Sequence, residues 1–144
     1  MNADPWLKFA YATATLPTDL TAARALYAAA FATFKHRHDA GGAYSAWGGI
    51  LDTFVYRWSD FSTLHRWIDE LNALRRRHPR YPSTTVEARV VGGMVSALMW
   101  SDPRHALLRP WVERAEELLL DNTIPLTQRL TLANTLMFYR VWWL

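Results

Sequence analysis

Residues 64–69 read LHRWID and residues 108–113 read LRPWVE, so a leucine, a tryptophan, an aliphatic residue and an acid recur in the same order after 44 positions. The stretches GGIL at 48–51 and GGMV at 92–95 are related by the same shift. Repetition at a period of roughly 20–50 residues is typical of proteins built from stacked supersecondary units. We therefore interpret the rest of the chain as a set of repeats.

Two further repeats support this interpretation. Trp58-Ser59-Asp60 recurs at residues 100–102, after 42 positions. An upstream copy is offset by 40 positions: Tyr27, Phe31, Phe34 and Arg37-His38 precede Trp67, Leu71, Leu74 and Arg77-His78. A pair of helices cannot bury its apolar stripe alone, and stacked pairs share a continuous core.

Glycine doublets and tryptophans indicate where this core is tight. A glycine inside a helix costs up to about 1 kcal/mol relative to alanine, so Gly48, Gly49, Gly92 and Gly93 predict close approach of another helix. The repeated positions of three tryptophans predict that they lie in the core: Trp47, Trp67 and Trp111.

Helix start signals divide the chain. Asp4-Pro5 and Asp102-Pro103 each place a capping carboxylate before a proline suited to a first helical position, and 84–87 (TTVE) reads as a capping box. Pro110 predicts either a kink or a helix that starts near Arg109. We expect no strand and seven helices, at about 5–15, 19–38, 43–57, 61–78, 84–101, 104–120 and 125–143.

The expected fold is all-α, a right-handed superhelical stack of antiparallel helix pairs in one domain, 1–144. Its repeat units would be 5–38, 43–78 and 84–120, with a partial unit at 125–143. The last segment ends in apolar residues without a capping signal, although helices usually finish with one. We expect the chain to be part of a larger protein.

The chain resembles a known family at these repeats. Trp6-x2-Phe9-Ala10-x2-Thr13, followed by Ala23-x3-Tyr27-x2-Ala30, is similar to the tetratricopeptide pattern, and Trp47-x2-Ile50-Leu51-x2-Phe54 is a weaker copy. Two features depart from the pattern. Glu70 and Arg114 stand where the second helix of the repeat has its third, small residue, and the period is 40–44 residues rather than about 34. The run at 4–31 (DPWLKFAYATATLPTDLTAARALYAAAF) and the run at 43–61 (AYSAWGGILDTFVYRWSDF) resemble the helical segment of bacterial MalT/LuxR-type ATP-dependent transcriptional regulators. The resemblance implies a segment that receives a signal or contacts partner domains.

Composition sets broad limits. The chain is 51% apolar with eight Trp and no Cys, which indicates a packed core and excludes disulfides and thiolate metal sites. A net charge of +3 does not demand a nucleic-acid partner. Because the sequence has neither a signal peptide pattern nor an apolar span, we expect a cytoplasmic protein that does not enter a membrane.

The chemically active side chains do not form a known catalytic motif. His36 and His38 point to different faces of a helix, so we predict no metal site and no cofactor. The other histidines, at 65, 78 and 105, are expected at the surface or at helix ends. Glu113 and Glu117 share a face beside arginines, which favours a solvated charged surface over an acid–base pair.

Two groups of residues are candidates for contact with a partner. The basic cluster lies at a predicted helix C-terminus, and the two tryptophans lie near the end of the chain: Arg75, Arg76, Arg77 and Arg80, and Trp142 and Trp143. Phe138, Val141 and Leu144 add apolar surface to the last helix, which predicts self-association, including a homodimer, through that helix.

The sequence therefore predicts a non-catalytic regulatory or protein-interaction module of a bacterial signalling or transcriptional regulatory protein. Its partner would be another domain of the parent protein or a separate protein. One alternative is an effector-sensing domain that binds a small molecule between helices, and a second is an enzyme of unknown type.

Overall fold

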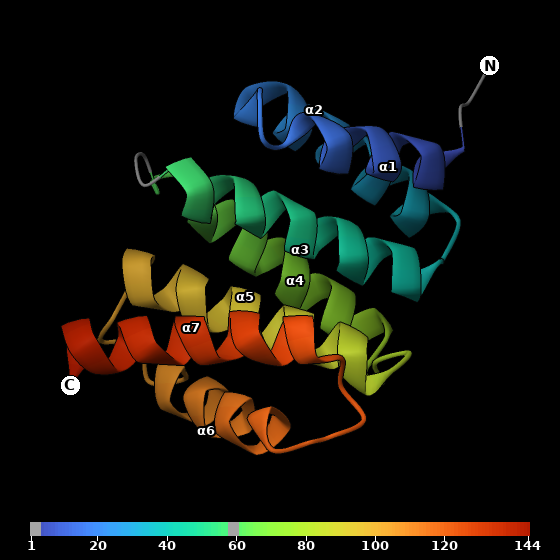
Figure 1. The fold of residues 1–144 in the computed structure, drawn as a ribbon. Helices are drawn as coiled ribbons and strands as arrows, with labels where there is room; N and C mark the ends of the chain where they lie inside the picture. Colours follow the sequence, from blue (N-terminus) through green and yellow to red (C-terminus); the bar gives the residue numbers. More distant parts are fainter. Residues whose placement is uncertain (1–3, 58–60) are drawn as a thin grey trace. The chain divides into compact units, whose positions relative to one another are not determined.

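The computed structural model describes residues 4–57 and 61–144, and these residues form seven α-helices and no strand (Figure 1). The expectation of an all-α chain is confirmed. The chain divides into two compact units, Met1–Arg80 and Tyr81–Leu144. The first contains α1 (Pro5–Thr15), α2 (Leu20–His36), α3 (Ala40–Arg57) and α4 (Leu64–Arg77), and the second contains α5 (Thr84–Ser101), α6 (Leu108–Leu119) and α7 (Leu126–Trp143).

The predicted start of the first helix is confirmed. Asp4 caps α1 by accepting a hydrogen bond of 2.9 Å from the backbone N–H of Trp6. Pro5 occupies the first helical position, where its missing N–H costs nothing because the first N–H groups of a helix have no helical partner.

The interpretation of Asp102-Pro103 as a helix start is wrong. Asp102 instead ends α5, where its backbone N–H donates to the carbonyl of Leu98 at 2.8 Å. Helix α6 begins only at Leu108, so Pro110 lies in its first turn, as in the second of the two predicted alternatives. An aspartate before a proline fits either end of a helix, because proline both starts helices and follows their ends.

The predicted capping box at 84–87 is also wrong by one residue. Ser83 is the N-cap of α5 and accepts from the N–H of Val86 at 3.2 Å, whereas Thr84 is already helical. Glu87 bonds the guanidinium of Arg114 rather than the start of its own helix.

The turn between α2 and α3 is closed at both sides. His38 adopts a left-handed backbone conformation, with φ at 56°. The N–H of Asp39 reaches back to the carbonyl of Phe34, and the N–H of His38 reaches the carbonyl of Lys35, which is the Schellman arrangement. Asp39 then caps α3 through Gly42 N–H at 2.9 Å.

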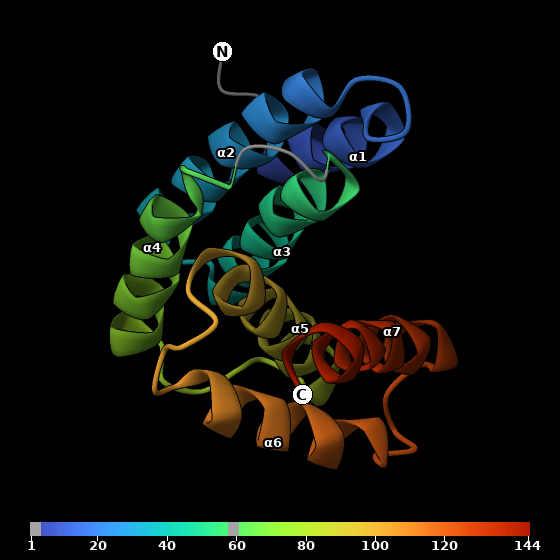
Figure 2. The same ribbon diagram turned by 90° about the vertical axis from the view of Figure 1, so that its left-hand side faces the viewer.

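Helices α1, α2 and α3 pack against one another in the first unit (Figures 1 and 2). The predicted close approach at Gly49 is confirmed, since a Cβ there would lie 2.5 Å from Cε1 of Tyr27. The phenolic oxygen of Tyr27 also lies 2.9 Å from the hydroxyl of Thr13 on α1. The absence of a side chain on α3 thus gives Tyr27 its place between α1 and α3.

Trp47 and Trp67 lie in the core of the first unit, as predicted. The indole Nε1 of Trp47 donates 2.8 Å to the backbone carbonyl of Trp67, and this buried bond joins α3 to α4. The ring of Trp67 meets that of Phe31 edge to face, with centroids 5.8 Å apart. These contacts hold α4 on α2 and α3.

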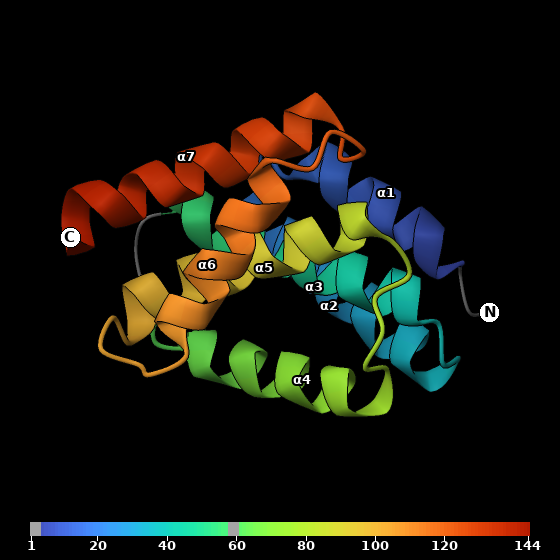
Figure 3. The same ribbon diagram turned by 90° about the horizontal axis from the view of Figure 1, so that it is seen from below.

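The second unit packs α6 and α7 against α5 (Figure 3). Trp111 on α6 is buried, as predicted. A Cβ at Gly92 would lie 3.3 Å from Leu132 of α7, which confirms a close helix approach there. The approaches at Gly49 and Gly92 are not related by the 44-residue shift, so these two glycine doublets are used differently in the two units.

The repeated register is visible in which side chains are buried. The members of each aromatic or apolar triplet are buried at corresponding positions of α2, α4 and α6: Tyr27, Phe31 and Phe34; Trp67, Leu71 and Leu74; Trp111, Ala115 and Leu118. The predicted equivalence of Trp58-Ser59-Asp60 with residues 100–102 lies outside the described residues. Among the residues described, no helix is long and apolar enough to cross a lipid bilayer.

Candidate interaction surface

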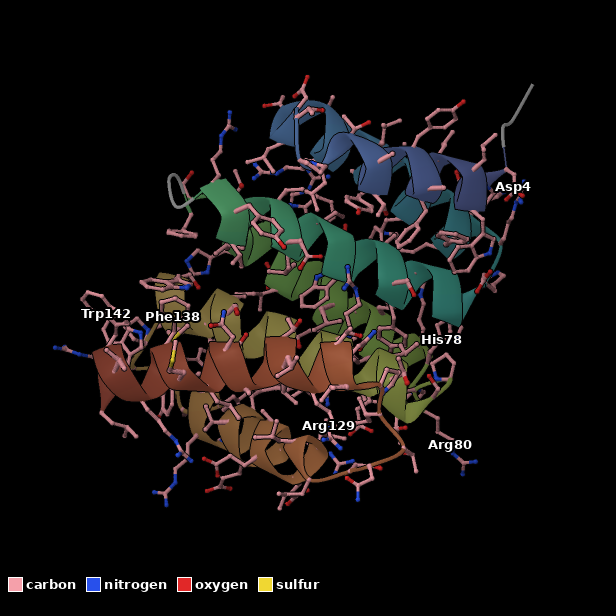
Figure 4. All side chains as sticks on the ribbon, in the orientation of Figure 1. Asp4, His78, Arg80, Arg129, Phe138 and Trp142 are labelled. Carbon is pink, nitrogen blue, oxygen red and sulfur yellow. The ribbon has the colours of Figure 1, made fainter. Side chains whose placement is uncertain are left out.

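The basic cluster lies where the sequence predicts it, at the C-terminal end of α4. Arg75, Arg76 and Arg77 form the exposed last turn of the helix, and Arg80 follows in the exposed loop (Figure 4). Positive charge at a helix C-terminus complements the helix dipole. The cluster is therefore explained in part by the stability of α4.

A small cavity of about 100 Å³ lies beside this helix end. Lys35 of α2 and Glu70 of α4 form an ion pair of 2.8 Å in its wall, and Arg77 and His78 complete the polar lining. Pockets that hold drug-sized ligands measure about 300–1,000 Å³. The cavity is large enough only for an ion or a few water molecules.

Helix α7 has an apolar face with four exposed large side chains and the half-buried Ala133, which we call the α7 stripe: Leu126, Leu130, Ala133, Met137 and Val141. At 3.6 residues per turn these positions fall within an arc of about 80°. The four large side chains are 52–69% exposed.

The same helix uses another face to pack within its unit. Leu132 and Leu136 are buried, and they lie about 120° around the helix from the centre of the α7 stripe at 3.6 residues per turn. Helix α7 therefore has two apolar faces, and the core of residues 81–144 covers only one of them.

The two candidate tryptophans of α7 differ in their surroundings. Trp143 packs edge to face on Trp100 of α5, with centroids 6.4 Å apart. Trp142 is exposed and Phe138 is half-buried, and both lie in the C-terminal half of the helix (Figure 4). Neither tryptophan belongs to the α7 stripe.

A second exposed apolar face lies on α1. Leu7 and Tyr11 are both more than half exposed, whereas Trp6 packs on the ring of Phe34 with centroids 4.7 Å apart. This face was not predicted from the sequence, and of the α7 stripe only Val141 was, because apolar spacing along a helix does not show which of its apolar residues the core covers.

The carboxylates of α6 are held in ion pairs on the surface. Glu113 accepts from Arg109 at 3.1 Å, Glu116 from Arg140 at 2.8 Å, and Glu117 from Arg114 at 2.7 Å. Hydrogen bonds to Glu87 and then to Glu117 raise the pKa of Arg114. In the loop after α6, hydrogen bonds from Thr123 lower the pKa of Asp121. This network joins α5, α6 and α7 and stabilises their arrangement.

Three of the histidines lie in the turns and loops between helices. His38 lies in the turn after α2, and His78 is half-exposed after α4 (Figure 4). His105 accepts from the N–H of Leu107 through Nδ1 at 3.0 Å. Within residues 4–57 and 61–144, no three histidine or acidic side chains gather as they would around a metal ion.

Comparison of the chain with known protein families, curated proteins and solved structures gives no match. The resemblance to tetratricopeptide repeats and to MalT/LuxR-type regulators therefore stays a prediction.

Proposed function

We propose that this chain is a non-catalytic protein-interaction module of a cytoplasmic bacterial regulatory protein. The observation that carries the proposal is the α7 stripe, where four large apolar side chains are exposed along one helix face. Contiguous exposed apolar patches mark interaction sites. A helix face of this kind binds a partner helix through residues three and four apart.

The repeated register supports the further proposal that the helix pairs form a tetratricopeptide-like superhelical stack. Buried residues at corresponding positions of α2, α4 and α6 are what such a stack requires. The paired carboxylates of α6 support a structural role for the charged surface, because each is bound to an arginine rather than directed into a cavity.

The cavity beside α4 favours one alternative, an effector-sensing domain. Lys35, Arg77 and His78 surround it, and Glu70 offsets part of their charge. A volume of about 100 Å³ limits such an effector to a small ion. Titration with inorganic phosphate tests this alternative, and heat that disappears in the Arg77→Ala variant would favour it over the interaction module.

The proposed function is tested by calorimetry. Residues 1–144 are titrated with the rest of the protein encoded by the same reading frame. We expect binding, either in this titration or as heat of dissociation when residues 1–144 are diluted alone, that the Leu130→Glu substitution abolishes and that Thr131→Glu, an exposed position outside the stripe, leaves unchanged. A second comparison changes Arg75, Arg76 and Arg77 to Ala, and loss of affinity would add the basic cluster to the interface.

Two results would overturn the proposal. One is a reading frame that encodes nothing beyond this chain together with the absence of any binding partner for the stripe. The other is turnover of a substrate by the isolated chain.

A further inference from the structure

We propose that the α7 stripe is occupied by the α7 stripe of a second copy of this chain, with the two helices antiparallel. The inference deepens the proposed function and rests on it, because it names the partner of the same surface. The pair is symmetric, and each copy contributes the same residues to it.

The spacing of the stripe is complementary to itself when reversed. The four large side chains of the stripe, Leu126, Leu130, Met137 and Val141, are separated by four, seven and four positions, a spacing that is the same in both directions. If a two-fold axis passes between positions 133 and 134, Leu126 of one copy faces Val141 of the other, and Leu130 faces Met137. All four large side chains on each copy then meet an apolar partner, and none is left in water.

Of the two residues that flank this axis, Ala133 belongs to the stripe and is small, whereas Asn134 lies beside the stripe. Ala133 lies at the centre of the stripe, where two antiparallel helices cross. Helix axes in contact lie about 8–10 Å apart, and small residues at the crossing permit the shorter distances. A large residue at 133 would hold the helices apart and expose the flanking pairs.

The charges at the border of the stripe predict how the pair responds to salt. Helix α7 carries Arg129 and Arg140 and no acidic residue. Both lie on the same side of the stripe, so the two-fold axis brings all four arginines of the pair to one edge. Glu116 lies 2.8 Å from Arg140 and offsets part of this charge. Mild repulsion remains, and added salt should strengthen the dimer by screening it.

The area of the surface predicts that the dimer is weak. The 18 residues of α7 span about 27 Å at 1.5 Å per residue, and a helix is about 10 Å wide. If each copy contributes one such face, the total area buried between them is less than the roughly 1,200–2,000 Å² that stable complexes bury. We expect the chain to be monomeric at about 10 µM and largely dimeric at about 1 mM, which corresponds to a Kd of about 100 µM.

Sedimentation equilibrium over this concentration range measures the molecular mass in solution and so tests whether the chain dimerises. Leu130→Glu removes an apolar contact twice per dimer and should raise the Kd by more than about a hundredfold. Thr131→Glu should leave the Kd within about twofold, and circular dichroism establishes that both variants are folded. A strict monomer at about 1 mM, or a dimer that Leu130→Glu leaves intact, overturns the proposal.

Cysteine cross-linking tests the direction of the pair, since the chain has no cysteine of its own. Disulfides require Cα atoms about 4.4–6.8 Å apart. Ala133→Cys should cross-link with itself, and Leu126→Cys should cross-link with Val141→Cys but not with itself. Self-cross-linking of Leu126→Cys as fast as that of Ala133→Cys indicates parallel helices and overturns the antiparallel arrangement.

The outcomes separate this inference from the proposed function. Binding of the stripe to another segment of the same protein, without self-association, overturns the second copy as occupant and leaves the interaction module intact. Association that weakens as salt is added indicates a partner with acidic residues and also overturns the second copy. Self-association that Leu130→Glu weakens, that added salt strengthens and that cross-links in the antiparallel pattern supports both proposals.

Discussion

Replacing Trp67 by alanine tests whether the repeated tryptophan is a core residue. Trp67 is 6% exposed and fills the space between α4 and Phe31 of α2. Deleting a large buried aromatic side chain costs about 3–5 kcal/mol, because its contacts are lost and a cavity remains. Urea unfolding followed by circular dichroism measures the loss. With a slope of about 2 kcal/mol/M, the midpoint for the first unit should fall by about 2 M.

Two further variants test whether the loss of stability in Trp67→Ala comes from the burial of the tryptophan. Trp111→Ala, at the corresponding position of α6, should destabilise the second unit by a similar amount, since Trp111 is 9% exposed. Trp142→Ala, at a position that is 60% exposed, should change the free energy of unfolding by less than about 0.5 kcal/mol. A midpoint of Trp67→Ala close to that of the unsubstituted chain would refute the core role of the repeat.

Three further variants test individual contacts by the same urea titration. Trp47→Phe should lower the free energy of unfolding by about 2 kcal/mol, because it removes the buried bond to the carbonyl of Trp67 and leaves a small cavity; an unchanged midpoint would contradict this. Gly49→Ala should be destabilising by about 1 kcal/mol or more despite the better helix propensity of alanine, since its Cβ would overlap the ring of Tyr27, and a gain in stability would show that the ring yields. His38→Gly should raise the free energy of unfolding by about 1 kcal/mol, because glycine adopts the left-handed conformation at no steric cost; a loss would show that the His38 side chain stabilises the turn.

Most of the secondary structure was predictable because its signals are local. Asp4-Pro5 starts α1, and the spacing of apolar residues places all seven helices close to their observed bounds. The errors occur where a local signal fits two structures. Asp102 before Pro103 ends α5 rather than starting α6, and Ser83 caps α5 although Thr84 has the same chemistry.

The sequence by itself determined the helices and the burial of the repeated tryptophans, because capping and apolar periodicity act within a few residues of each other. Its composition excluded a cysteine site. Only the tertiary structure decided which face of α7 is buried. Leu132 and Leu130 are equally apolar, and nothing in their neighbours along the chain distinguishes them. Leu132 is buried because it meets Gly92 of α5, while Leu130 lies on the side that no helix of its unit covers. A choice between two apolar faces depends on contacts made 40 residues away, and that is why the candidate interaction surface appears only in the folded chain.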